Sequence, residues 1–393
     1  MYIECTPGAP MMDTLDHLPP LPLIVHYWSN KRQDELAIYQ VLRQYGRVRH
    51  IELSLSHSIL HKALALMNEH FPILEHLRLL CFDREYWLPP TLPEAFLAPN
   101  LRHLTIVGVD LPKGLQVLTS TVSLVKLSLS NVQSSGYFYP RILLARLQSL
   151  PLLEELSVTF SIPIPHHGTE RELLGEIGAP ITLACLKYLD VGGIGAYLEP
   201  FVAQIRVPLL ERLSIDFREN RNQIAFVPPD LSYLINITKV FKFSSAMVMF
   251  QENQVYVDMG HDHGMVQVWV SCPPSCPSMN QQIGVAARIY DALIPTLSDV
   301  EKLKLFFGYQ PEDKPWISRV ESAETWHNFL RRFVGVKIIC TDNTLFAMLS
   351  YSLQVDEVRS DPGFLPNLQY VYGKGKGLTT RRVVGSPVQF LPA

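Results

Sequence analysis

The sequence is poor in cysteine and in long apolar runs, and each shortage excludes a class of protein. Six cysteines are spread over 393 residues, a density far below that of small secreted domains held together by disulfides. No apolar run approaches the roughly 18 residues that a membrane-spanning helix needs, and the N-terminus shows no signal-peptide pattern. We therefore expect a cytoplasmic or nuclear protein with reduced thiols and without a membrane as its partner.

Charge is also scarce. Charged residues make up 18% of the chain, and the formal net charge is -3. A protein that holds a polyphosphate backbone carries a large excess of Lys and Arg, so we expect no nucleic acid partner. Apolar residues make up 47% of the chain, which is too much for a disordered protein. The chain should therefore fold around a large core.

The common motifs of enzyme classes are missing: the sequence contains no G-x-S-x-G, H-E-x-x-H, G-x-x-x-x-G-K-[ST] or G-x-G-x-x-G. The segment 373–377 alternates glycine with lysine, but its spacing is wrong for a phosphate loop, and we interpret it as a flexible basic tail. We expect the protein to be no enzyme and to need no cofactor. An enzyme is the weaker alternative, which a deep pocket lined by converging titratable groups would favour.

The best candidate for a metal site from spacing combines His261 and His263 with Cys272 and Cys276. Two imidazoles and two thiols would complete a tetrahedral zinc shell. The spacing is unlike that of the common zinc fingers, and proline lies on both sides of Ser275. An exposed loop with incidental cysteines is therefore favoured over zinc, and we expect no metal site.

The sequence does contain a repeated pattern, L-x-x-L-x-L, in which other apolar residues can replace leucine. Seven copies follow one another at steps of 23 to 33 residues, which overlap and slightly exceed the range of about 20–29 residues typical of leucine-rich repeats. Apolar and other residues alternate over the last four positions, as in a strand with one buried face. The apolar positions are Val48-Ile51-Leu53, Leu74-Leu77-Leu79, Leu101-Leu104-Ile106, Leu124-Leu127-Leu129, Leu153-Leu156-Val158, Leu186-Leu189-Val191 and Leu210-Leu213-Ile215.

This pattern predicts an α/β fold, a leucine-rich-repeat solenoid in which a curved parallel sheet is lined by outer helices. A strand this short cannot bury its apolar face alone, so neighbouring repeats must stack. Apolar residues three and four positions apart predict outer helices over 34–42 and 59–67. Proline stands two residues before the first apolar position in four copies, where it ends the preceding helix and favours extended chain. These prolines are Pro72, Pro99, Pro151 and Pro208.

The repeats are irregular, clear over 48–217 and degenerate over 218–393. We find no linker that separates domains, so we expect a lead-in over 1–30 and one solenoid-like region over 31–393. The looser copies are Val300-Leu303-Leu305, Phe333-Val336-Ile338 and Leu368-Val371; further strands are expected over 240–243, 255–257 and 266–270, and helices over 281–294, 322–333 and 344–354.

The ninth repeat position departs from the ordinary pattern, because it holds neither Asn nor Cys. The usual buried asparagine ladder is therefore missing, and the backbone groups at each turn must be satisfied in another way. The ninth positions are Ser56, Phe82, Val109, Val132, Ser161, Ile194 and Arg218.

Several segments carry a family resemblance that covers almost the whole chain. They are 3–10, 18–27, 47–51, 71–77, 98–104, 326–330 and 365–369. In these segments the chain resembles the fungal, chiefly basidiomycete, F-box proteins with degenerate leucine-rich repeats. In that family the F-box docks on the Skp adaptor of a cullin ubiquitin ligase, and the repeats are expected to choose the substrate.

The resemblance implies a substrate-recognition role for this chain, with the Skp adaptor and a cullin as partners if an F-box is present in the full-length product. No apolar helical pattern precedes Cys5, so residues 1–30 are interpreted as a lead-in that follows a missing F-box. The chain is then either a shortened gene product or a repeat-only relative. The alternative function is a structural or scaffolding leucine-rich-repeat protein without a ligase role.

The third and fifth positions of each motif should point away from the core, onto the concave face of the sheet. Solenoids commonly bind proteins there, so we expect this face to hold a protein partner of unknown identity. Three histidines at third positions would lie roughly 5 Å apart, and their charge would respond to pH near neutrality. An ordinary solvated face is nevertheless favoured over a special switch or a metal site. The candidate residues are His50, Glu52, His76, Arg78, His103, Thr105, Lys126, Ser128, Glu155, Tyr188, Asp190 and Arg212.

Overall fold

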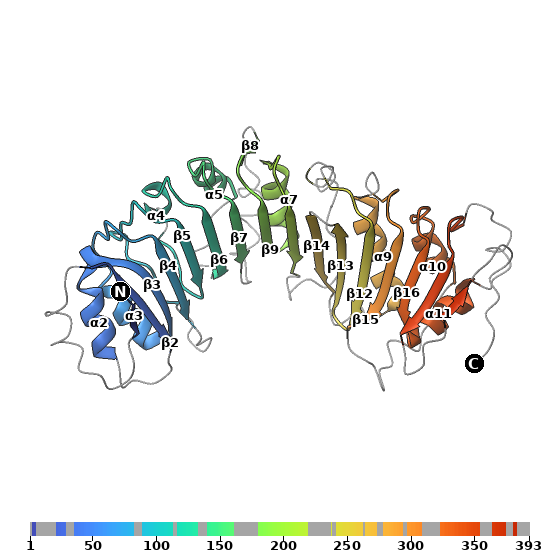
Figure 1. Ribbon diagram of the computed structural model, residues 1–393, viewed down its shortest axis with the longest axis horizontal. Coiled ribbons are helices and arrows are strands. Elements are labelled where there is room, and N and C mark those ends of the chain that lie inside the picture. The colour runs from blue at the N-terminus through green and yellow to red at the C-terminus, as the bar shows by residue number, and fades with distance from the viewer. Residues whose placement is uncertain are drawn as a thin grey trace. The chain divides into compact units, whose positions relative to one another are not determined.

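The chain forms two compact units, each a mixed α/β structure around a mostly parallel sheet (Figure 1). The first unit contains Met1–Gly193 and Gln204–Leu209, and the second contains Ile194–Ala203 and Leu210–Ala393. The computed structural model describes residues 2–4, 21–28, 35–81, 89–112, 116–132, 140–160, 180–218, 237, 241–261, 264–272, 278–293, 297–308, 323–353, 364–374 and 380–382.

The sheet of the first unit is parallel at every described strand pair. Its strands lie side by side in the order in which they follow along the chain. They are β1 (Tyr2–Glu4), β2 (Leu23–Trp28), β3 (Val48–Leu55), β4 (His76–Cys81), β5 (His103–Val107), β6 (Lys126–Val132), β7 (Glu155–Phe160) and β9 (Tyr188–Gly193).

The expected helices near the N-terminus are confirmed. Helix α2 (Glu35–Leu42) packs beside β2, and α3 (His57–Ala65) packs beside β3 (Figure 1). A separate two-stranded parallel sheet joins β8 to β10. The remaining elements of this unit are the 3-10 helix η2 (Tyr45–Arg47), α4 (Gln116–Thr119), α5 (Pro140–Leu147), β8 (Ile181–Thr182) and β10 (Ile205–Arg206).

The repeated motif forms the core in both units, as its pattern predicts. All apolar motif positions of the seven clear copies are 6% exposed or less. Within the first unit they stand opposite one another in register, as Leu77 and Leu104 do across β4 and β5. Because side chains alternate between the two faces of a strand, this burial commits the intervening residues to the opposite face.

A turn before each strand explains the position of the prolines. Pro72 and Pro99 stand second in four-residue turns, closed by hydrogen bonds from Leu74 N to Phe71 O and from Leu101 N to Ala98 O. Proline favours this place because its ring presets the backbone angle there. The sequence interpretation is thus refined: proline starts a turn that leads into the strand.

Backbone hydrogen bonds tie these turns to one another at the start of the strands. The carbonyl of Glu75 accepts from the amides of both Arg102 and His103, and the carbonyl of Arg102 accepts from Val125 and Lys126 in the next repeat. Each turn is therefore tied to the following one, which pairs backbone polar groups where each strand begins.

The second unit differs from the expected purely parallel array, because its sheet is mixed. Strands β12, β13 and β14 pair antiparallel, as do β17 and β18, while the other described pairs are parallel. In spatial order the strands are β11 (Arg212–Phe217), β14 (Gly264–Ser271), β13 (Gln254–His261), β12 (Ser245–Gln251), β15 (Lys302–Phe307), β16 (Ile338–Asp342), β17 (Tyr370–Lys374) and β18 (Thr380–Arg382).

The late helices are confirmed, and strands β15 and β17 form at two of the looser repeat copies. The register expected for the copy at Phe333-Val336-Ile338 is wrong: on β16 the buried residues Ile339 and Thr341 stand opposite Leu303 and Leu305. Helix α9 packs beside β13, and α10 packs against both α9 and α11. The helices of this unit are α7 (Gly195–Ala203), α9 (Met279–Asp291), α10 (Ala323–Leu330) and α11 (Asn343–Leu353).

Three sequence expectations fail in the second unit. Residues 241–243 form no strand, and position 240 lies outside the described residues. Strand β12 was missed, although Ala246, Val248 and Phe250 alternate as buried residues along it. The supposed basic tail begins inside β17, which includes residues 373 and 374, while 375–377 lie outside the described residues.

Truncation of a motif leucine should destabilise the protein far more than truncation of an exposed leucine. We expect Leu104→Ala, at a side chain that is fully buried, to lower the free energy of unfolding by about 2–5 kcal/mol because it leaves a cavity. Leu36→Ala on α2 is the matched control, since this leucine is 74% exposed. Urea denaturation measures both, and equal losses would contradict the assigned core.

Candidate functional site

Side chains at the third and fifth motif positions meet on the face of the first-unit sheet opposite the buried leucines, which we call the polar face. The third positions stand opposite one another across neighbouring strands, and so do the fifth positions. The third-position row is His50, His76, His103, Lys126, Glu155 and Tyr188, and the fifth-position row is Glu52, Arg78, Thr105, Ser128, Ser157 and Asp190.

All candidate residues from the sequence except Arg212 lie in these two rows. Arg212 belongs to β11 of the second unit, where it pairs in register with Met265 of β14. Within the rows, Lys126 and Glu155 form an ion pair of 2.5 Å, and Ser157 donates a hydrogen bond of 2.8 Å to Asp190. The polar face is therefore organised by contacts between neighbouring repeats.

Glu52 is the most connected side chain of the polar face. His26 Nδ1 donates to its Oε2 over 3.0 Å, and His50 Nε2 lies 4.0 Å from the same oxygen. Its other oxygen, Oε1, lies 2.9 Å from Nη1 of Arg78 as an ion pair. Because the Glu52 side chain is only 12% exposed, the charge of Arg78 and the hydrogen bond from His26 compensate part of the cost of placing its charge away from water.

His26 is not expected from the repeat pattern, because β2 precedes the first copy of the motif. A signal was nevertheless present: Leu23, Val25 and Tyr27 alternate with Ile24 and His26, and the first three are 4% exposed or less. Alternation of this kind marks a strand with one buried face. Its register places His26 directly opposite Glu52, so the row of ionisable side chains begins one strand earlier than expected.

Four histidine rings follow one another across β2, β3, β4 and β5. The ring centroids of His26 and His50 lie 4.7 Å apart, those of His50 and His76 4.9 Å, and those of His76 and His103 4.2 Å. Nδ1 of His103 lies 2.8 Å from Nδ1 of His76. At that distance one ring nitrogen donates a hydrogen bond and the other accepts it.

This arrangement disfavours protonation of the ladder. The pKa of His50 is lowered to about 4, chiefly by burial and then by the neighbouring His26 and His76, against the attraction of Glu52. Burial also lowers the pKa of His76. It lowers the pKa of His103 as well, and the neighbouring His76 lowers the pKa of His103 further. These three imidazoles are thus neutral at neutral pH, and the expected pH-dependent charge is moved to more acidic conditions.

The zinc site considered from spacing cannot form as one cluster. His261 lies at the end of β13 opposite Gly264, whereas Cys272 follows the far end of β14, where Ser271 pairs with Gln254. The intervening eight-residue strand spans roughly 26 Å, which is far beyond the reach of a shared ion. The other two residues of that set, at 263 and 276, lie outside the described residues.

A group of aromatic and charged side chains lies on the strands of the second unit. The rings of Tyr256 and Trp269 lie 3.9 Å apart on β13 and β14. Burial raises the pKa of Asp258, while a hydrogen bond from the hydroxyl of Tyr256 and the charge of Lys304 oppose this shift. Sequence analysis missed this group because its strands follow no regular repeat.

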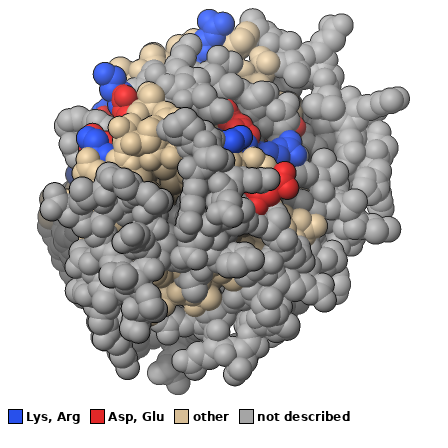
Figure 2. Space-filling model, turned by 90° about the vertical axis from the view of Figure 1, so that its right-hand side faces the viewer, with Lys and Arg blue, Asp and Glu red and all other residues tan. Residues whose placement is uncertain are grey.

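Comparison with known proteins adds no assignment: no protein-family model matches the sequence, and no curated protein matches it significantly. Within the described part of the chain, no helix is long and apolar enough to cross a membrane. On the side of the molecule in Figure 2, described Lys and Arg lie among Asp and Glu, without one large patch of a single sign.

The histidine ladder should make the protein less stable in acid. His50, His76 and His103 have lowered pKa values in the folded state, so the unfolded chain binds more protons between about pH 4 and 6.5. Stability is therefore full above about pH 6.5 and falls as the pH falls towards 4.

From pH 7.5 to pH 5, the free energy of unfolding of the wild type should fall. In the variant with glutamine at all three ladder positions we expect it to fall by on the order of 1 kcal/mol less, after allowance for solvent screening. The paired substitution His57→Gln and His61→Gln on α3 serves as the control. Urea denaturation at both pH values gives the difference. An identical pH dependence in all three proteins would refute the role of the ladder.

Proposed function

We propose that this chain is a leucine-rich-repeat protein that binds another protein on its polar face and has no enzymatic activity. The observation that carries the proposal is the register of the first-unit strands, which sets ionisable and polar side chains into two continuous rows. Stacked repeats commonly offer such an extended surface to partners. The steps of 23 to 33 residues between motif copies support the same reading of the fold as a solenoid.

The chemistry of the polar face suits a protein partner that carries charge of both signs. Arg78, with a side chain 48% exposed, and Lys126, with one 43% exposed, lie among carboxylates and histidines. Such side chains give specificity and orientation. In the second unit, Trp269, which packs against the buried Tyr256, is of a residue type that often dominates binding energy in protein interfaces.

A role in substrate recognition for an F-box-type ubiquitin ligase is the context that we propose for this binding. It rests on the resemblance to fungal F-box proteins with degenerate repeats, and it makes the bound protein a substrate. A scaffolding repeat protein without a ligase role is the second candidate, and the same polar face supports it equally well.

The first test removes two neighbouring side chains of the polar face. We expect His76→Ala combined with Arg78→Ala to weaken partner capture at least ten-fold without unfolding the chain. The matched control combines His61→Ala with Lys62→Ala, which removes a histidine and a cation from α3. Quantitative affinity capture from the native organism compares the three proteins, and circular dichroism checks their folding. Equal capture by all three would argue against this face.

The second test separates the two candidate contexts. In a ubiquitin ligase, the full-length product should co-purify with the Skp adaptor and a cullin, and its captured partner should become more abundant when the proteasome is inhibited. Mass spectrometry of material captured with and without the inhibitor measures both. If neither adaptor nor cullin co-purifies, and the amount of captured partner does not respond to the inhibitor, the scaffolding role is favoured.

A further inference from the structure

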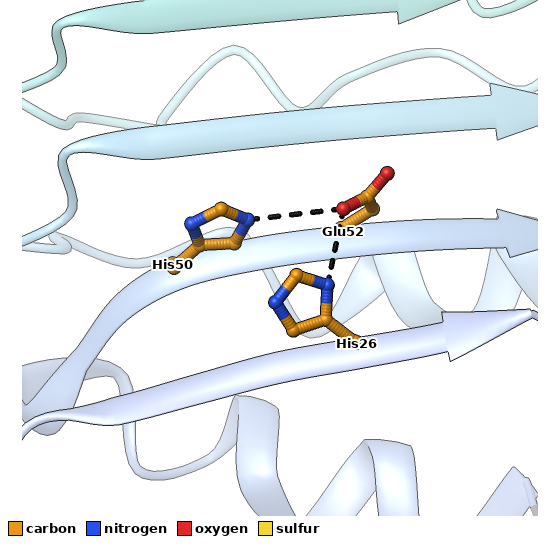
Figure 3. Close-up of side chains that lie close together, drawn as sticks. All are labelled: His26, His50 and Glu52. Atoms are coloured by element: carbon orange, nitrogen blue, oxygen red, sulfur yellow. Dashed lines mark hydrogen bonds and ion pairs between the residues drawn. The ribbon is translucent and has the colours of Figure 1, made fainter. Parts of the chain in front are cut away.

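Two histidines and a carboxylate converge at the start of the polar face, on the neighbouring strands β2 and β3 (Figure 3). Nitrogens of His26 and His50 and an oxygen of Glu52 all lie within 4.8 Å of one another. The three side chains are 31%, 26% and 12% exposed. The group is therefore packed by its surroundings and still open to solvent.

We propose that His26 Nδ1, His50 Nε2 and Glu52 Oε2 bind a divalent transition-metal ion of the zinc type, with water in the remaining coordination positions. Metal binding is a function separate from partner binding, and its test needs no partner protein. Two imidazoles and one carboxylate form a ligand set that zinc takes in sites with an open position, whereas calcium and magnesium require sites made of oxygen ligands.

The distances fit such an ion after small side-chain rotations. Ligand atoms around a tetrahedral zinc ion lie roughly 3.3 Å apart, given bonds of about 2.0–2.1 Å. In the structure, Oε2 of Glu52 lies 3.0 Å from Nδ1 of His26 and 4.0 Å from Nε2 of His50. The ion would replace the hydrogen that His26 now donates, and this imidazole would then carry its hydrogen on Nε2.

The backbone holds the three ligands in place. Register pairs His26 with Glu52 and Ile24 with His50 across β2 and β3. The alternate residues of both strands are buried, including Val25 at 1% exposure and Ile51 at 0%. Rotation of either strand would therefore expose core residues, so the ligand-bearing face is fixed.

Arg78 completes the environment of the site from β4. Its guanidinium lies 2.9 Å from Oε1 of Glu52, which orients the carboxylate and leaves Oε2 facing the two imidazoles. Outer partners that orient a ligating carboxylate in this way are usual in metal sites. Arg78 is thus a positioning residue for the proposed ion.

One histidine pair and one single histidine in the first unit supply matched controls. His57 and His61 lie one helical turn apart on α3, with ring centroids 6.4 Å apart, and a pair at this spacing offers two ligands to an ion. His103 belongs to the same ladder as His50 but lies on β5, outside the proposed set. Loss of either control should not remove the site.

The test is calorimetric titration of the full chain with zinc chloride at neutral pH. We expect one ion per chain in the tightest class of sites. His26→Gln and Glu52→Gln should each weaken that binding at least ten-fold, since loss of even an outer partner often costs 10–100-fold. The combined His57→Gln and His61→Gln variant, and separately His103→Gln, should keep the wild-type affinity. Magnesium chloride should give no comparable binding.

A second readout does not depend on affinity fits. Zinc should raise the melting temperature of the wild type and of both control variants, because an ion that binds only the folded chain stabilises it. At the same zinc concentration it should raise the melting temperatures of His26→Gln and Glu52→Gln much less, while circular dichroism without metal shows that both variants are folded. Wild-type affinity in both ligand variants, or loss of tight binding in the α3 variant alone, would overturn the proposal.

Discussion

The fold depends on one constraint, namely that each short strand must hide its apolar side chains against a neighbour. Leu77, Leu104 and Leu127 each come from a different repeat, and each is 1% exposed or less only because the next strand stands beside it in register. A single repeat could not bury this surface alone. The turns before the strands are also joined to one another by backbone hydrogen bonds. Apolar packing and backbone hydrogen bonding therefore favour the same stacked arrangement.

The same constraint brings ionisable side chains of neighbouring strands close together. With core residues on one side, His50, His76 and His103 are forced into a row at the spacing of neighbouring strands, and burial lowers the pKa of each. At the start of the row, Glu52 offsets part of the cost of burying ionisable side chains, because it accepts a hydrogen bond from His26 and forms an ion pair with Arg78. The proposed partner surface and the proposed metal cluster thus arise from one packing rule.

Sequence patterns predicted elements well wherever the strand or helix period was regular. The motif copies gave the core and the two rows, including the opposition of His50 to His76. Prediction failed at 241–243, where Phe241 and Phe243 are buried without being in a strand, because apolar residues in a short run cannot distinguish a strand from a packed loop. It also missed β12, whose alanine and methionines contribute little to strand propensity.

By itself, the sequence determined which face of each strand is buried and which residues of each repeat remain for function, because alternation along a strand is a local property. Only the tertiary structure decided which of those residues meet. His26 and Glu52 are 26 positions apart and belong to different strands, so their contact depends on the register of β2 against β3. In the second unit, the antiparallel pairs are short hairpins between consecutive strands. The parallel pairing of β11 with β14 and of β12 with β15 joins segments that are far apart along the chain, and only the tertiary structure decided it, because a parallel pair needs a long crossover connection.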